Sequence, residues 1–289
     1  MNDKYDLHVH STASDGSLTP TELVRLAAKS EIRTLALTDH DTTAGVEEAS
    51  REAQLLGINL IPGVEISTTW NNRGVHIIGL GIDLDCTALQ CGLESIRTFR
   101  LWRAEEIGRR LEQAGIPGAF AEARRIAGGT VIARPHFASF LVDRGIAPNM
   151  QSVFKRYLVR GKPGYVPSRW ADFNEAIEWI KTAGGTATIA HPARYSLSRT
   201  QLRRLLGDFV AAGGEAVEVV SGTHSKDEIQ TIAFHAAYFG LLASVGSDYH
   251  GPGHCQAVLG CLPDLPGAVI PIWEKWGEMP PLKVANQVL

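Results

Sequence analysis

The chain carries histidines and acidic residues at short spacings, in combinations that bind metal ions. His8 and His10 are separated by one residue, so in an extended strand both imidazoles point to one face and can bind one ion. Later in the chain, Asp248 and His250 repeat this two-residue spacing behind a Gly-Ser pair. The full set of candidate ligands is His8, His10, Asp15, His40, Glu65, His76, His191, Asp248 and His250.

The ligand types in this set indicate the chemistry of the site. Imidazoles and carboxylates without any thiolate suit Mn²⁺, Zn²⁺ or Fe²⁺ better than soft metals. The set is too large for one ion, so we expect two or three divalent ions bridged by a carboxylate. Single members are weak signals, because a lone His76 in an apolar strand is more often a core residue. It is the recurrence of such residues that predicts a metal site.

Short apolar runs predict the strands that must position these side chains. Most of the runs are rich in Val, Ile, Leu and Ala, as strands buried on both faces are. Seven of the candidates lie at or just after the C-terminal ends of these runs, where α/β barrels assemble their active sites. Asp15 and His76 are less simply placed. The predicted strands are 5–9, 34–37, 59–61, 75–82, 186–190, 216–220 and 241–245.

Helical segments alternate with these strands. Thr19, Pro20 and Glu22 form a helix start, with Thr19 as N-cap, Pro20 in the first turn and Glu22 completing a capping box. Further helices are predicted over 43–56, 172–182 and 201–212, each followed by glycine near its end. Alternation of strand and helix predicts an α/β fold with a mainly parallel sheet, and seven strands favour a barrel.

The stretch 83–170 differs from the rest of the chain. It contains a long helix over 87–114 and shorter helical pieces, with no convincing strand. We therefore expect a barrel domain formed by 1–82 and 171–289, and a helical insertion over 83–170 that covers the active-site mouth. The insertion is rich in arginine, which predicts either solvated helix faces or a clamp for phosphate. These arginines are Arg97, Arg100, Arg103, Arg109, Arg110, Arg124, Arg125 and Arg134.

Composition narrows the class of protein. The 289 residues carry a net charge of −3, which argues against a protein held to duplex DNA by phosphate neutralisation alone. The sequence shows no long apolar run and no secretory signal, so we expect no membrane association. The four cysteines form no CxxC pair, which predicts a reduced, cytoplasmic protein without disulfides.

Taken together, these motifs resemble the PHP (polymerase and histidinol phosphatase) family over residues 6–250. The resemblance implies a distorted (β/α)7 barrel with a helical insertion, a trinuclear metal centre and phosphoester hydrolysis, with Mn²⁺ favoured and Zn²⁺ or Fe²⁺ as alternatives. It also implies how the ligands divide among three ions, with Glu65 bridging two of them. The three implied sets are His8, His10, Glu65 and Asp248; Glu65, His76 and His191; and Asp15, His40 and His250.

Within the family, residues 132–138 and the Gly- and Pro-rich segment 161–167 resemble one branch. Its members include a nucleoside 3′,5′-bisphosphate phosphatase and an exoribonuclease acting on short RNA from the 5′ end. The resemblance implies that this chain removes the 3′-phosphate of a nucleoside 3′,5′-bisphosphate by attack of a metal-activated hydroxide. The residues implied in this chemistry are Asp15, His40, Glu65, His191, Asp248 and Arg134.

Five residues are candidates for binding the substrate. Arg134 can grip a phosphate with two parallel hydrogen bonds. Arg103 offers a cation for a second phosphate, and Trp102 offers an indole for base stacking, although it can equally pack against the barrel. His136 is either a phosphate contact or leaving-group acid, or the partner of a structural hydrogen bond at a helix start. His224 follows the sixth strand at the same barrel edge.

Three alternatives to the phosphatase remain at this point. An exoribonuclease on short 5′-phosphorylated RNA would use the same metals and attack the same 3′ phosphorus. A non-catalytic metal-binding module would lack some ligands, whereas all nine positions are filled. A metal-dependent amidohydrolase would share the barrel and histidines, but it usually has a ligand lysine after a strand, and none is so placed here.

Overall fold

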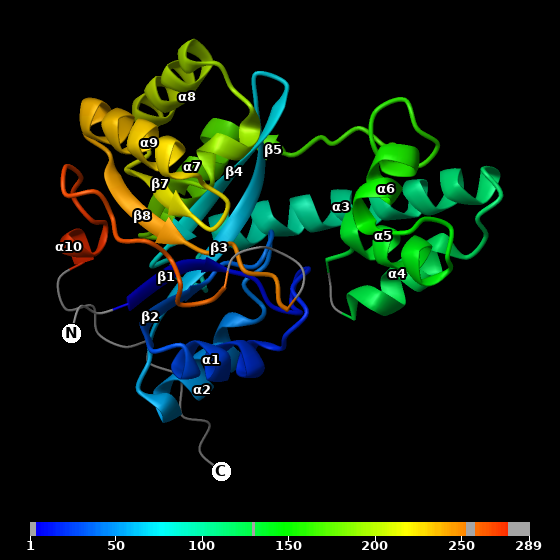
Figure 1. Cartoon of the computed structure of the whole chain (residues 1–289), viewed down its shortest axis with the longest axis horizontal. Helices are drawn as coiled ribbons and strands as arrows, with labels where there is room; N and C mark the ends of the chain where they lie inside the picture. The colour runs from blue at the N-terminus through cyan, green and yellow to red at the C-terminus, as the bar shows by residue number, and fades with distance from the viewer. Residues whose placement is uncertain (1–3, 129–130, 253–257, 277–289) are drawn as a thin grey trace.

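The computed structural model describes residues 4–128, 131–252 and 258–276. Its centre is a barrel-like sheet, whose strands lie side by side in Figure 1. The order is β1-β2-β3-β4-β6-β7-β8, with the short β5 paired to β3. A bridge between Val9 and Tyr249 joins the last strand region back to the first. The strands are β1 (Lys4–Val9), β2 (Ile32–Leu37), β3 (Asn59–Trp70), β4 (Arg73–Leu80), β5 (Ala171–Asp172), β6 (Thr186–Ile189), β7 (Ala216–Ser221) and β8 (Leu242–Gly246).

The α/β barrel predicted from the sequence is confirmed, with one difference in strand direction. β1 to β3 and β6 to β8 are parallel, but β4 runs antiparallel to both neighbours. The predicted strand over 59–61 continues to Trp70 and turns back through Asn71 and Asn72, both with positive φ, into β4. Pro62, which directly follows the predicted strand 59–61, lies where β3 changes partner. It is the last residue paired with β2, and Gly63 is the first paired with β4.

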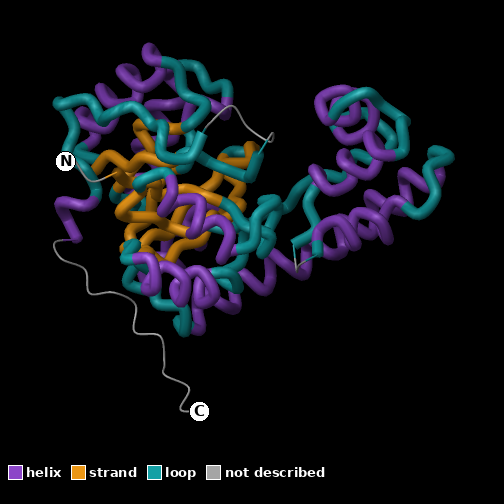
Figure 2. The backbone as a smooth tube through the Cα atoms, turned by 60° about the horizontal axis from the view of Figure 1, so that its bottom comes forward, coloured by secondary structure: helices purple, strands orange, loops and turns teal. Residues whose placement is uncertain are grey.

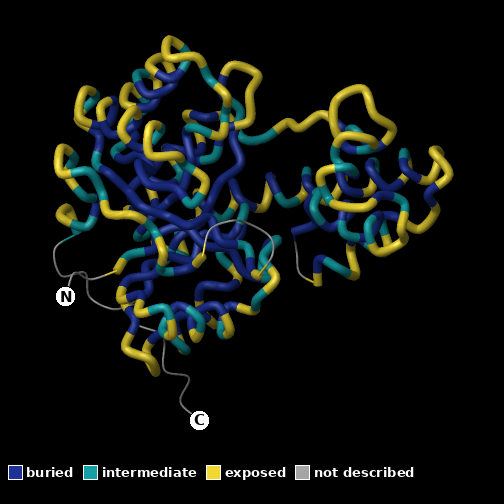
Figure 3. Tube along the Cα trace, viewed as in Figure 1, coloured by how far each residue is buried: buried dark blue, intermediate teal, exposed yellow. Residues whose placement is uncertain are grey.

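Helices cover the barrel on two sides. α1 and α2 pack together below the sheet in Figure 1, and α7, α8 and α9 pack above it. The capping box predicted for Thr19 and Glu22 is present, and α2 ends at Gly57 in the left-handed conformation, as expected. Buried positions concentrate in the strands and the inner helix faces (Figure 3). These helices are α1 (Pro20–Lys29), α2 (Val46–Leu56), α7 (Phe173–Thr182), α8 (Arg199–Ala211) and α9 (Lys226–Phe239), with a 3-10 turn η2 (Pro192–Tyr195) and α10 (Trp273–Trp276).

Between β4 and β5 the described chain is helical and extends away from the barrel (Figure 2). The long helix α3 packs Leu93 and Ile96 into the main barrel core, whereas Ile107 and Leu111 belong to a separate apolar cluster with α4 and α5. α3 therefore connects two hydrophobic cores. The elements are α3 (Thr87–Gln113), α4 (Ala119–Ala127), α5 (Arg134–Asp143), α6 (Met150–Val153) and a π-helical turn η1 (Phe154–Leu158). Across the described ranges, no helix has the length and apolar composition needed to cross a membrane.

Candidate metal centre

All nine candidate ligands meet at one rim of the barrel. β1 supplies His8 and is followed by His10, and the chain after β8 supplies Asp248 and His250. The other members come from β3, β4 and the segments after β1, β2 and β6. Their ligand atoms form three groups, each within 4.8 Å. The groups are His10, Asp15, His40 and His250; His8, Glu65, His191 and Asp248; and His40, Glu65 and His76.

Glu65 lies at the centre of this arrangement and is fully buried. Its Oε1 lies 2.9 Å from His76 Nδ1 and 2.9 Å from His191 Nε2. Its Oε2 lies 3.3 Å from the Nε2 atoms of both His8 and His10. The two carboxylate oxygens therefore face different imidazoles, as a carboxylate that bridged two ions would.

Asp248 completes the group around His8 and His10. Its Oδ1 lies 3.4 Å from His8 Nε2 and 3.2 Å from His10 Nε2, and the two Nε2 atoms are 3.0 Å apart. These atoms and Glu65 Oε2 converge from β1, β3 and the chain after β8. The set implied by the family resemblance for one ion is thus compact in space.

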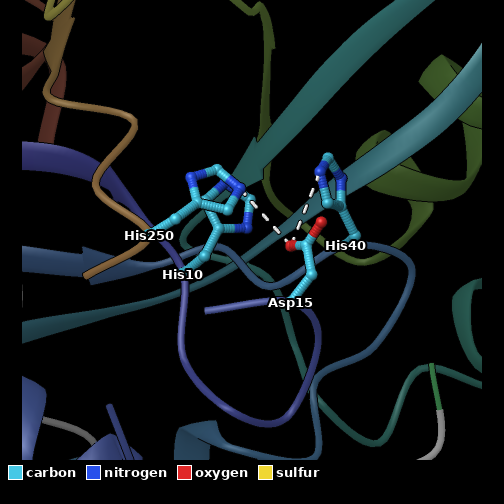
Figure 4. A group of neighbouring side chains, drawn as sticks. All are labelled: His10, Asp15, His40 and His250. Carbon is cyan, nitrogen blue, oxygen red and sulfur yellow. Dashed lines mark ion pairs between the residues drawn. The ribbon is translucent and has the colours of Figure 1, made fainter. Parts of the chain in front are cut away.

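Asp15 organises the remaining group, drawn in Figure 4. Its Oδ1 lies 3.3 Å from His250 Nε2 and 3.9 Å from His40 Nε2. His10 also belongs to this group by distance, and so it lies between two of the three sets. His40 bridges in a similar way, because its Nδ1 lies 2.9 Å from Glu65 Oε2. The three sets are contiguous rather than separate.

The residues fit a cation because several buried polar atoms lie close together without forming hydrogen bonds of normal geometry. In the part of the chain that the structure describes, these atoms include Asp15 Oδ1, His40 Nδ1 and Glu65 Oε2. Buried polar atoms are normally hydrogen-bonded, and each exception needs an explanation. Divalent ions held by nitrogen and oxygen donors would satisfy these atoms.

The carboxylates and imidazoles of the cluster shift one another's pKa values. Burial opposes ionisation of Glu65, but His40 and other facing rings hold the pKa of this carboxyl well below its usual range. Asp15 is likewise held at a low pKa by His40 and His250, against the effect of burial. Burial and then the charge of His250 lower the pKa of His10 to about 3, whereas Asp15 raises the pKa of His250 to about 10 against the effect of burial. Ionised carboxylates are the form that binds metal ions, and a protonated imidazole must release its proton when a metal ion binds.

Buried acidic residues beneath the rim were not predicted from the sequence. Asp39 accepts hydrogen bonds from the hydroxyls of Ser11 and Ser14 at 2.7 and 2.6 Å, and so holds the loop that carries Asp15. Glu218 on β7 contacts two ligand residues and is fully buried. A glutamate inside an otherwise apolar strand was the available signal, because charged residues are almost never buried without a partner.

A cavity of about 720 Å³ opens over the metal-site residues. Arg100, Arg103 and Arg134 line it from α3 and α5, together with Trp170. The arginines lie close enough to interact. Burial, followed by the charges of Arg134 and Arg100, lowers the pKa of Arg103 to about 10. One side of the cavity is thus cationic, and its floor carries the histidines and carboxylates.

Arg194 joins the cavity from the barrel side and was also not predicted. Its guanidinium pairs with Asp248 Oδ2, while Asp248 Oδ1 faces the histidines. Its position three residues after His191, in the same turn η2, was the signal that could have identified it. The cavity therefore has a cation next to the candidate ligands as well as on the opposite wall.

Three residues predicted to bind the substrate do not line the cavity. Trp102 is 53% exposed on α3, and Trp170 takes the position on the cavity wall. His136 is buried at the start of α5, where its Nδ1 accepts a hydrogen bond from Ala133 N at 3.0 Å, which is the structural role considered as the alternative. His224 turns its Nδ1 to the backbone oxygen of Val219 at 3.1 Å. By contrast, Arg103 and Arg134 line the cavity.

Comparisons with known proteins give a consistent result. A family model described as PHP domain matches residues 6–106. A 3′,5′-nucleoside bisphosphate phosphatase of Chromobacterium violaceum is 50% identical over 93% of this chain and 95% of its own length. A 5′-3′ exoribonuclease of Haemophilus influenzae is 48% identical over 96% of this chain and all of its own length. A solved structure from C. violaceum, described as an amidohydrolase with bound sulfate, superposes with a TM-score of 0.90 at 49% identity and covers 94% of this chain and 95% of that one.

Proposed function

The chain belongs to the PHP domain family of phosphoric ester hydrolases, and from this premise we propose that it removes the 3′-phosphate from nucleoside 3′,5′-bisphosphates. The products would be a 5′-nucleotide and inorganic phosphate. One observation carries the proposal: one cavity is lined both by six of the nine candidate ligands and by four arginines from α3, α5 and η2. A small ligand with two phosphates matches that combination, because one phosphate can lie over the ligands while the other is held by guanidinium groups.

We propose that the nine residues hold two or three divalent ions, with Mn²⁺ favoured and Zn²⁺ or Fe²⁺ as alternatives. Bound divalent ions supply a water of lowered pKa and positive charge for the phosphoryl oxygens. Glu65 would bridge, because its two oxygens face different imidazoles. Asp15, His40, His191 and Asp248 would complete the coordination.

The arginines bind and orient the substrate in this proposal. Arg134 and Arg103 present guanidinium groups to the cavity from α5 and α3, and Arg194 reaches the same space from η2. A guanidinium can donate two parallel hydrogen bonds to a phosphate, which fixes the direction of the group as well as its charge. Holding the substrate in one orientation over the reacting groups raises the rate of the chemical step. On this basis, residues 83–170 cover the active-site mouth and contribute recognition, while the barrel contributes the metal centre.

Exoribonuclease activity on short 5′-phosphorylated RNA is the second candidate. The 48% identical relative from H. influenzae bears that name. The same 3′ phosphorus is attacked when the first internucleotide bond is cleaved and when a 3′-phosphate is removed. One metal centre can therefore serve both reactions. The two substrates differ in whether a chain continues beyond that phosphorus. A non-catalytic metal-binding module is not favoured, because no candidate ligand position lacks a ligand residue.

A cytoplasmic location suits these substrates. Cys86, Cys91 and Cys261, the cysteines among the described residues, are all free thiols. Free thiols persist in a reducing compartment.

The decisive experiment measures phosphate release from adenosine 3′,5′-bisphosphate by protein that has been treated with chelator and then supplied with Mn²⁺. A 5′-phosphorylated RNA trinucleotide is assayed in parallel. Release from the bisphosphate that depends on metal, with little trimming of the RNA, is the expected result. Preferential trimming would establish the exoribonuclease instead. No turnover of either substrate would contradict both proposals.

A further inference from the structure

We propose that Glu218 is a positioning residue that holds two metal ligands, His8 and His191, in a fixed relation to each other. Glu218 lies on β7, which pairs with β6, the strand that precedes His191, and its side chain is fully buried. Each of its carboxylate oxygens contacts a different ligand residue. The proposal rests on the metal centre proposed above, but it does not depend on the identity of the substrate.

The first contact fixes the ring of His8. Its Nδ1 lies 3.1 Å from Glu218 Oε1. In the neutral ring, an ionised Glu218 favours the proton on Nδ1, which leaves Nε2, 3.3 and 3.4 Å from Glu65 and Asp248, able to bind a metal ion. A hydrogen bond from the far nitrogen is the usual way in which proteins select the tautomer and orientation of a metal-binding histidine.

The second contact fixes the backbone of His191. The backbone N–H of this residue donates to Glu218 Oε2 at 2.5 Å. His191 has a φ of 28°, which lies in the left-handed region that residues with a side chain rarely adopt. Such a conformation persists only where the surroundings enforce it. In this conformation the ring directs Nε2 to within 2.9 Å of Glu65 Oε1.

Gly246 at the end of β8 leaves room for this arrangement. A Cβ atom at position 246 would lie 2.3 Å from Glu218 Oε1 and 2.2 Å from His8 Cβ. Both distances are far below any normal contact, and so only glycine permits the carboxylate and the imidazole to meet there. The end of β8, the strand that precedes Asp248, is thereby shaped around the contact between Glu218 and His8.

These contacts make Glu218 the connection between two ligand residues of the metal centre. His8 faces Glu65 Oε2, whereas His191 faces Glu65 Oε1. By distance, His8 and His191 belong to one group with Glu65 and Asp248. Loss of Glu218 should therefore weaken metal binding at this group through two of its ligands at once.

Glu218→Gln tests this because glutamine has the same shape but cannot satisfy both contacts. If the amide oxygen accepts from His191 N, the amide NH₂ faces His8 Nδ1 and donates to it. The proton of His8 would then reside on Nε2, where it blocks metal binding. If the amide is turned around, its NH₂ opposes the N–H of His191. In either orientation one ligand loses its support.

The measurement is metal content and affinity, using Mn²⁺ and Zn²⁺ alone. Metal-stripped protein is titrated against a competing chelator, and tightly bound metal is counted after dialysis. We expect Glu218→Gln to weaken binding by about 10–100-fold and to lower the number of retained ions. Thr188→Val is the matched control, because Thr188 is a fully buried polar residue on the adjacent strand β6 without a hydrogen bond from its hydroxyl in the described structure. It should bind metal as the parent protein does.

Glu218→Asp provides a second, independent variant that keeps the charge but shortens the reach. We expect weakened metal binding here too, and unfolding of the metal-free protein close to that of the parent. Parent-like affinity in either folded Glu218 variant overturns the proposal, and so does an equal loss in Thr188→Val. If the parent chain itself binds neither ion, the metal centre is wrong and the role of Glu218 falls with it. These outcomes separate the two proposals.

Discussion

The rim of the barrel and the helical segment between β4 and β5 contribute to one cavity in different ways. The rim supplies imidazoles and carboxylates from backbone positions that the sheet fixes, for example His10 N bonded to Tyr249 O at 2.9 Å. The helical segment supplies guanidinium groups from α5 and from α3, whose C-terminal half packs with α4 and α5 in a second apolar cluster. On the proposed function, metal binding would depend on the barrel core, and substrate recognition would depend also on this second cluster.

A buried ion pair connects the two regions. Arg100 on α3 donates to Asp41 Oδ2 at 2.5 Å and to Ser67 Oγ at 2.8 Å. Asp41 directly follows His40, and Ser67 lies opposite His76 in the β3–β4 register. The long helix is thus attached beside two candidate ligands. This attachment explains how helices that pack mainly on each other can place arginines over the metal-site residues.

The largest loss of activity should come from removing a candidate ligand at the rim. His191→Ala and Asp15→Ala should each lower metal-dependent phosphate release by more than the ~10²–10³-fold that follows loss of a single electrostatic donor. The control is His235→Ala on α9, outside the cavity, which should retain turnover. Unfolding of the metal-free variants shows whether the fold survives. Full activity in either ligand variant would refute the metal assignment.

Much of the rim could be predicted because its signals are local. Alternation along a strand places His8 and His10 on one face, and strand ends in a barrel meet at one edge. The meeting of these nine side chains at one rim could therefore be predicted from the sequence. Their role as metal ligands remains a prediction. The continuation of β3 past Pro62 was not predictable, because it depends on a change of strand partner that leaves no periodic pattern.

The residues of the cavity wall were harder to predict, because they too are brought together by contacts between distant parts of the chain. Arg134 and Arg103 were identified, but nothing local distinguishes Trp102 from Trp170 as the indole that faces the cavity. That difference depends on how α3 is rotated against the barrel. The pairing of Glu218 with His8 joins residues 210 positions apart, and it is likewise a property of the closed sheet.

The next largest effect should come from breaking the connection between the regions. Asp41→Asn keeps the acceptor for Ser67 N, at 2.7 Å, but leaves the buried guanidinium of Arg100 without a counter-charge. We expect the free energy of unfolding to fall by about 3–5 kcal/mol, as for other buried pairs that lose one partner. Urea denaturation of the metal-free protein measures this. The control Glu122→Gln breaks the exposed pair with Arg125 and should change little. Equal stability of both variants would mean that the ion pair does not hold the regions together.

A smaller effect is expected at the cationic wall. Arg134→Ala should cost about 2–4 kcal/mol in kcat/KM, because it removes a phosphate donor while the ligand cluster remains intact. Metal affinity should stay at the parent value, which separates this variant from those at the rim. Arg134→Lys should recover only part of the loss, since an ammonium group cannot donate two parallel hydrogen bonds. Loss of metal binding in Arg134→Ala would show that the two regions are not functionally separate.

The smallest effect distinguishes the two indoles. Trp170 lines the cavity, with the guanidinium carbon of Arg100 at 4.7 Å from its ring centroid, whereas Trp102 is exposed beside Phe99. Trp170→Ala should raise KM for adenosine 3′,5′-bisphosphate by an amount equivalent to about 1–3 kcal/mol of base stacking. Trp102→Ala should leave KM unchanged. Ribose 3,5-bisphosphate, which has no base to stack, should be processed equally by both variants. A raised KM in Trp102→Ala alone would support the base-stacking role considered for Trp102 from the sequence, and it would require α3 to turn when substrate binds.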